Sequence, residues 1–142
     1  MVGPVLQEAF LVPVTDTSAL RDATILIVDD DRDVLLAMET AFKAEGANTH
    51  TAGDGNSAIR LTQEAKPDLV VLDMMLPARS GFLALEKIKG NDDSPLVIMV
   101  TANDGKRHQA YAQSLGVDGY LIKPVPLGQL METAAELLSA RS

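Results

Sequence analysis

The chain has 142 residues, 46% of them hydrophobic and 23% charged, which is typical of one globular domain. Its formal net charge of −8 argues against nucleic acid or an anionic membrane as a direct partner, because both attract basic surfaces. The absence of cysteine excludes disulfides and thiolate metal sites. No apolar run approaches the roughly 20 residues of a membrane span, and no basic stretch opens a signal peptide. We therefore expect a cytoplasmic protein.

Residues 1–22 differ from the rest of the chain. They contain one glycine and two prolines ahead of the polar stretch 15–18. This composition predicts an N-terminal arm or linker, with two alternatives: a disordered extension, or a segment whose apolar residues 10–12 dock on the domain. Residues 23–142 are predicted to form one domain.

From residue 24 onward, short apolar runs alternate five times with amphipathic segments of helical period. The predicted strands are 25–28, 47–51, 69–72, 96–100 and 119–122. Expected helix caps and stops are Gly46, Asp54, Pro67, Ser80, about Asp104, Gly116 and Pro126. The apolar faces expected to be buried carry Val34, Leu35, Met38, Ala41 and Phe42; Ala58, Ile59 and Ala65; Phe82, Leu83, Leu85 and Ile88; and Leu127, Leu130, Met131, Ala134, Leu137 and Leu138.

This alternation predicts an α/β fold of the (βα)5 type. Its five strands would form a doubly wound parallel sheet with helices on both faces and right-handed crossovers. The expected strand order is the flavodoxin-like 2-1-3-4-5, in which the order reverses between the first and third strands.

Those two strands end in carboxylates. Asp29 and Asp30 follow the first strand, and Asp73 follows the third. Ligands of open α/β sheets sit outside the carboxyl ends of the strands, so the three acids should converge there. Clustered carboxylates repel one another unless a cation lies among them, and oxygen ligands of this kind suit Mg²⁺, with Mn²⁺ as an alternative.

Two other strand ends add polar groups. Thr101 follows the fourth strand, and Lys123 follows the fifth. A lysine beside carboxylates can neutralise charge or bind a phosphoryl oxygen. Acids, a metal, a hydroxyl and a lysine together suit phosphoryl transfer, in which positioning and charge neutralisation do most of the work.

In this motif order the chain resembles the receiver domain of bacterial two-component response regulators. The matching elements are the pair Asp29-Asp30, Asp73 with the following Met74-Met75-Leu76-Pro77 and Gly81, the pair Thr101-Ala102, and Tyr120 with Lys123-Pro124. The resemblance covers about residues 23–140, and its specificity lies in the order of the elements rather than in any one of them.

The resemblance implies a role for each matching residue. Asp73 would accept the phosphoryl group, Asp30 would bind Mg²⁺ directly, and Asp29 would act mainly through water. The main-chain carbonyl of Met75 would be a further metal ligand. Thr101 and Lys123 would contact phosphoryl oxygens, and the Lys123-Pro124 bond would be cis. Tyr120 would be the aromatic residue that switches position.

The same resemblance implies a signalling switch that catalyses only its own phosphorylation and dephosphorylation. A sensor histidine kinase or a histidine phosphotransfer protein would donate the phosphoryl group. The face formed by the fourth helix, the fifth strand and the fifth helix would then change and be read by a downstream protein.

Several alternatives remain open from the residues alone. The acids 29–31 could cap the first helix, and we expect Asp31 to do only that. A haloacid-dehalogenase-like phosphatase uses similar groups, but it needs a further acidic pair after the lysine, and only Glu132 and Glu136 follow here. A receiver-fold module that binds partners without phosphate is the third reading. A calcium loop is excluded because Val34 and Thr40 occupy its glycine and glutamate positions.

Overall fold

The computed structural model describes residues 16–77, 80–102 and 105–141. Five strands form one parallel sheet in the order β2-β1-β3-β4-β5. The strands are β1 (Thr24–Val28), β2 (Asn48–Ala52), β3 (Leu69–Asp73), β4 (Leu96–Thr101) and β5 (Gly119–Ile122). The helical elements are η1 (Ser18–Leu20), α2 (Arg32–Ala44), α3 (Gly55–Ala65), α4 (Gly81–Ile88), α5 (Lys106–Ser114) and α6 (Leu127–Arg141). The predicted fold class and strand order are confirmed.

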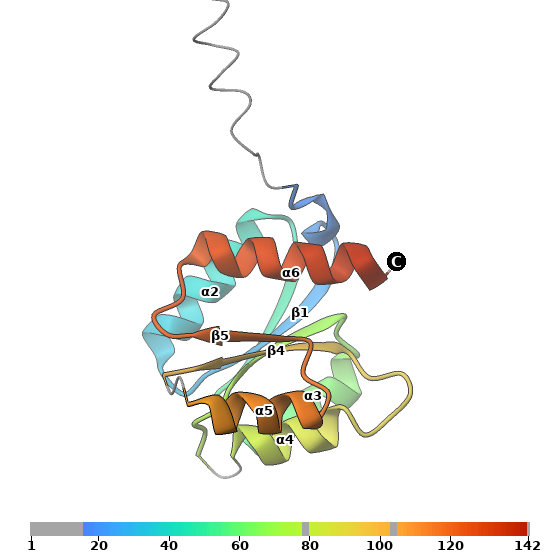
Figure 1. Ribbon diagram of the computed structural model, residues 1–142. Coiled ribbons are helices and arrows are strands. Elements are labelled where there is room, and N and C mark those ends of the chain that lie inside the picture. The colour runs from blue at the N-terminus through green and yellow to red at the C-terminus, as the bar shows by residue number, and fades with distance from the viewer. Residues whose placement is uncertain (1–15, 78–79, 103–104, 142) are drawn as a thin grey trace, which may run out of the picture.

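Helices cover both faces of the sheet (Figure 1). Alternate residues of β1 show how the two layers form: Ile25 and Ile27 pack with residues of α2 and α6, whereas Leu26 and Val28 pack with residues of α3, α4 and α5. The central strand β3 is buried along its whole length. Both of its faces are therefore apolar, as expected for a strand between two helical layers.

Side-chain caps begin three of the helices. Asp31 accepts hydrogen bonds from the backbone N–H groups of Asp33 and Val34 at the start of α2. The Asp54 carboxylate accepts one from Ser57 at α3, and the Ser80 hydroxyl accepts one from Leu83 at α4. These contacts confirm the predicted caps, including the role expected for Asp31.

The predicted helix stops are also observed, with two corrections to the predicted core. Gly46 and Gly116 follow α2 and α5 with φ of +88° and +92°, values that favour glycine. Leu83 and Leu127, however, are 50% and 39% exposed, so placing them in the core was wrong. Ala84 occupies the buried face of α4 instead. Asp104, the expected start of α5, lies outside the described residues.

The segment before β1 packs on the domain. Leu20 in η1 is fully buried in the cluster that includes residues of α6, and Thr17 donates a hydrogen bond to the Glu45 carboxylate at 2.6 Å. The backbone N–H of Asp22 also donates to the carbonyl of Gly46. Among the described residues, no helix is long and apolar enough to cross a membrane.

Candidate functional site

Three carboxylates meet at the carboxyl edge of the sheet. Asp29 and Asp30 follow β1, and Asp73 is the last residue of the adjacent strand β3. One oxygen from each lies within 4.8 Å of the others. Asp29 and Asp73 are buried and Asp30 is exposed. The predicted convergence thus occurs where the strand order reverses, since β2 lies on one side of β1 and β3 on the other.

Lys123 reaches this cluster from the end of β5. Its Nζ lies 2.9 Å from Oδ2 of Asp29 and 3.2 Å from Oδ2 of Asp73, so one ammonium group bonds both buried acids. The lysine is tied to the neighbouring strand, because its backbone N–H donates to the Thr101 carbonyl at 2.7 Å. The Lys123-Pro124 peptide bond is cis, as the resemblance implies.

The pKa values of the site follow from burial and from these contacts. Burial raises the pKa of the Asp73 carboxyl, and the neighbouring Asp29 charge raises it further, against the opposing effects of the Met75 N–H and of Lys123. Burial alone would lower the pKa of Lys123, but bonding to Asp29 and the charge of Asp73 raise it above its ordinary value. The ammonium therefore stays charged, and the Asp73 carboxyl is protonated more easily than an ordinary aspartic acid.

Backbone N–H groups orient the remaining carboxylate oxygens. The N–H of Asp31 donates to Oδ1 of Asp29 at 2.9 Å, and the N–H of Met75 donates to Oδ1 of Asp73 at 3.1 Å. Each buried acid thus uses Oδ1 for its own loop and Oδ2 for Lys123. The two loops hold the carboxylates in place and direct them at a common point.

Three further predicted residues lie in or just after strands of the same sheet. Thr101 ends β4 and is fully buried. Tyr120 on β5 is half-buried and packs against the apolar layer formed with α3, α4 and α5. Met75 follows Asp73 by two residues, and its side chain is 68% exposed. The three acids, Thr101 and Lys123 therefore lie at the carboxyl ends of their strands, whereas Tyr120 lies within β5 and packs in the apolar layer.

The donor set fits Mg²⁺. Three carboxylates within 4.8 Å of one another offer only oxygen ligands, which this ion prefers. Among the described residues, only Lys123 forms ion pairs with these acids, and its one positive charge leaves two negative charges uncompensated when all three acids are ionised. A divalent cation would balance that remainder.

A hollow of about 480 Å³ with mostly apolar walls opens beside Lys123. Its lining residues are Val34, Ala37, Met38, Ala102, Lys123, Pro124, Val125 and Leu127. No sequence pattern predicts this hollow, because its walls come from segments far apart in the chain. Leu127, which the structure leaves outside the core, is among these lining residues.

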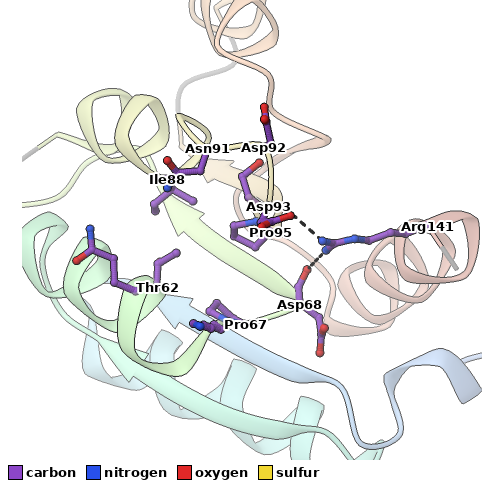
Figure 2. Close-up of a pocket in the computed structure, with 12 residues that line it drawn as sticks. Thr62, Pro67, Asp68, Ile88, Asn91, Asp92, Asp93, Pro95 and Arg141 are labelled. Atoms are coloured by element: carbon purple, nitrogen blue, oxygen red, sulfur yellow. Dashed lines mark hydrogen bonds between the residues drawn. The ribbon is translucent and has the colours of Figure 1, made fainter.

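A larger cavity of about 670 Å³ lies at the opposite, amino edge of the sheet (Figure 2). Arg141 of α6 donates to the carbonyls of Asp68 and Ser94 there, at 2.9 and 3.4 Å. Its walls include Lys66 and the acids Asp68, Asp92 and Asp93. It includes none of the predicted site residues, so the candidate site is the carboxylate edge.

Comparison with known proteins shows the family. Residues 25–135 match the model of the response regulator receiver domain, so the chain belongs to that family. It is 36% identical over 118 residues to the probable transcriptional regulatory protein TcrX of Mycobacterium tuberculosis, covering 83% of this chain and 50% of TcrX. The chain thus spans about half the length of this curated relative.

Solved structures agree with this assignment. A CheY-like receiver domain protein from Methanospirillum hungatei superposes with a TM-score of 0.81 at 28% identity, covering 84% of this chain and 96% of that one. A CheX–CheY complex with BeF3 and Mg²⁺ from Borrelia burgdorferi gives 0.76 at 25% identity, covering 82% and 90%. Receiver domains are signalling switches of two-component systems rather than classical enzymes, which favours the switch over the phosphatase alternative.

Proposed function

We propose that this chain is a phosphorylation switch in which Asp73 accepts a phosphoryl group from a phosphohistidine. The observation that carries the proposal is the single Lys123 ammonium shared by Asp29 and Asp73, with Asp30 beside them. This arrangement offers a nucleophilic carboxylate, a cation for phosphoryl oxygens and a metal-binding pair at one edge of the sheet. The Mg²⁺ bound to the CheY complex of Borrelia burgdorferi supports the same use of the acids here.

The chain's own residues account for the transfer step. An oxygen of the Asp73 carboxylate attacks phosphorus in line with the P–N bond, a new O–P bond forms, and the electron pair of the P–N bond returns to the imidazole nitrogen. Lys123 and the Thr101 hydroxyl take phosphoryl oxygens, so charge that develops on these oxygens meets donors already in place. A bound Mg²⁺, held by Asp30, Asp73 and the Met75 carbonyl with Asp29 mainly through water, would neutralise further phosphoryl charge.

The apolar hollow beside Lys123 is the proposed docking site for the phosphodonor. It opens at the same edge as the acceptor, and its walls offer apolar side chains such as Val34, Val125 and Leu127. A sensor histidine kinase or a histidine phosphotransfer protein would seat an apolar surface there and bring its phosphohistidine to Asp73. Burial of that surface would exclude water from the transfer.

The switch itself links the site to a distant face. The phosphoryl group would draw the buried Thr101 hydroxyl toward it, and Tyr120 would follow into the space that opens. The surface of α5, β5 and α6 would then change and be read by a downstream protein. The formal net charge of −8 favours a protein rather than nucleic acid as the downstream partner.

Phosphorylation by a small donor tests the proposal. With Mg²⁺ and acetyl phosphate, mass spectrometry should find one phosphoryl group, on Asp73, in an adduct that is stable to acid and cleaved by hydroxylamine. Asp73→Asn should abolish it, and Asp93→Asn, which removes an exposed acid far from the site, should not. Modification of a serine, threonine or histidine would contradict the proposal. No modification and no Mg²⁺ binding would favour a module that works without phosphate.

A further inference from the structure

The first turn of α4 approaches the backbone at the end of β3, next to Asp73, more closely than a side chain at Gly81 would allow. We propose that Gly81 is a positioning residue: its lack of a Cβ lets α4 close onto Asp73 and Met74, and this fixes the loop whose Met75 carbonyl would bind the metal. The inference rests on the proposed function, because it concerns the same metal-dependent site.

The three atoms nearest to a Cβ added at Gly81 are all backbone atoms. A Cβ added there would lie 2.5 Å from the Asp73 carbonyl oxygen, 2.6 Å from Cα of Met74 and 2.8 Å from the Met74 carbonyl oxygen. A flexible side-chain tip could move away from such an atom, but the end of a central strand cannot do so easily. Asp73 pairs with Val100 of β4, so its backbone is held from that side as well.

Space, and not backbone conformation, makes glycine necessary at this position. Gly46 and Gly116 have positive φ, whereas the φ of Gly81 lies outside the left-handed range. An alanine could adopt this backbone and would favour the helix more than glycine does. The clash with Asp73 and Met74 is therefore the reason to expect a loss on substitution.

The Met74 peptide units are held at several points. The Met74 N–H donates to the Val100 carbonyl at 3.0 Å, and the Met74 carbonyl accepts from the Gly81 N–H at 2.8 Å. The next N–H, of Met75, donates to Oδ1 of Asp73 at 3.1 Å. These bonds join α4, the loop and the acceptor carboxylate into one unit, so a shift at Gly81 moves the Met75 carbonyl relative to Asp73.

Mg²⁺ affinity measured on the folded protein tests this inference. Gly81→Ala should weaken Mg²⁺ binding by roughly 10–100-fold, the range seen when groups that orient metal ligands are lost. Gly128→Ala in α6 is the matched control, because an added Cβ meets nothing within 4 Å there. Ile88→Ala, which truncates a buried residue in the last turn of the same helix, separates positioning from a general loss of stability.

Both controls should bind Mg²⁺ within about twofold of wild type, a difference well below the loss expected for a disturbed ligand shell. Equal Mg²⁺ affinity in Gly81→Ala and wild type would overturn the inference. So would an equal loss in Gly81→Ala and Ile88→Ala, because the effect would then follow stability rather than position.

A measurement on the wild-type protein covers the case in which Gly81→Ala does not fold. Mg²⁺ should slow hydrogen exchange of the Gly81 amide, which bonds the Met74 carbonyl, and leave that of Gly128 unchanged. An unaltered Gly81 amide would overturn the inference. The proposed function fails separately, if wild type itself takes no phosphoryl group on Asp73; if wild type is phosphorylated and Gly81→Ala binds Mg²⁺ equally well, only the inference falls.

Discussion

One ammonium group compensates two buried carboxylates, and this sharing governs how single substitutions act at the site. Lys123 lies 2.9 Å from Asp29 and 3.2 Å from Asp73, which are 2% and 4% exposed. Without the lysine, both acids would keep their burial and lose their common partner. The penalty of an unpaired buried charge then appears in the free energy of unfolding.

Lys123→Met should therefore lower the free energy of unfolding at neutral pH by roughly 1–3 kcal/mol. The pKa of Lys123 is raised in the folded protein, so its stabilising effect is complete below the ordinary value of 10.5 and is lost as pH rises through the higher folded value. The difference between wild type and variant, measured by urea unfolding, should shrink above pH 10.5. Lys106→Met, at an exposed lysine of α5, should change stability by no more than about 0.5 kcal/mol. A constant difference across this range would contradict the assigned contact.

Asp73→Asn, unlike Lys123→Met, should not lower the free energy of unfolding at neutral pH. The raised pKa of Asp73 means that its charge opposes folding, with no penalty below the ordinary value of 3.8 and the full penalty above the folded value. Without Mg²⁺, the variant should match or exceed wild type at neutral pH, by roughly 0–2 kcal/mol, and this gain should vanish as pH falls toward 3.8.

Added Mg²⁺ should reverse the comparison. At 100 times its dissociation constant, an ion bound only by the folded state adds about 2.7 kcal/mol. Wild type should gain this amount, and Asp73→Asn and Asp30→Ala should gain less. Thermal unfolding with and without Mg²⁺ measures both effects, and an equal gain in all three proteins would show that these acids are not the ligands.

At the scale of elements, the sequence predicts the features that follow from hydrophobic periodicity. It does not predict which of several neighbouring apolar residues faces the core, because packing decides that. The run Leu69–Asp73 is apolar throughout up to its final carboxylate, so its place at the centre of the sheet and the acid at its edge could both be predicted. The short helix α4 carries apolar residues at nearly every early position. Only packing decides that Ala84 faces inward and that Leu83 remains half exposed.

Other features had no signal in the sequence. Leu20 is buried from a single 3-10 turn, which is too short to show a period. The joint bonding of Asp29 and Asp73 by Lys123 depends on loop geometry, whereas the convergence of the strand ends follows from topology alone. Lys66 ends α3 in the left-handed conformation, at φ 48° and ψ 59°, a position that pattern reasoning assigns to glycine.

Lys66→Gly should therefore stabilise the protein. A non-glycine residue in this conformation costs about 1–2 kcal/mol, and part of that gain is offset by the greater freedom of glycine in the unfolded chain. We expect a net increase of about 0.5–1 kcal/mol in the free energy of unfolding. Gly116→Ala places a side chain at φ +92° and should lower stability by about 1 kcal/mol or more. Denaturant unfolding of both variants decides, and a destabilised Lys66→Gly would show that its side chain matters more than its backbone.

Element η1 should contribute to stability through Leu20. This side chain is fully buried against the layer that contains α6, so Leu20→Ala should lower the free energy of unfolding by roughly 2–5 kcal/mol. Leu36→Ala is the control, since Leu36 is 61% exposed on α2 and its loss should matter little. Equal effects would mean that the segment before β1 lies outside the cooperative fold. That result would support the predicted boundary between an arm at 1–22 and a domain at 23–142.

At the scale of the whole molecule, the two edges of the sheet have different roles. The carboxyl edge gathers Asp29, Asp73 and Lys123, and the amino edge is tied by Arg141, which reaches from α6 to the carbonyls before β3 and β4 (Figure 2). The last turn of α6 is therefore anchored far from the site. Changes that follow phosphorylation should be concentrated in the part of α6 nearer Lys123 and in α5 and β5.

The charged residues of α5 and α6 bear on whether two copies of the chain associate. The helix α6, part of the proposed output face, carries the exposed acids Glu132 and Glu136, and α5 begins with the exposed bases Lys106 and Arg107. Arg141, the basic residue in the last turn of α6, already bonds backbone carbonyls of its own domain. Exposed ion pairs contribute only about 0–1 kcal/mol each, so pairing of α5 bases with α6 acids between two copies would set orientation more than affinity.

We therefore expect a monomer or a weak dimer before phosphorylation, and no specific DNA binding by this chain. Sedimentation at micromolar concentration should give a mass near the 15.1 kDa of one chain. Reversing the charges with Glu132→Lys and Glu136→Lys should leave that mass unchanged, whereas a dimer held by these acids would dissociate. A tight dimer in the absence of phosphate would contradict the first expectation. Specific binding of a DNA duplex at physiological salt would contradict the second, since a chain of net charge −8 offers little attraction to phosphates.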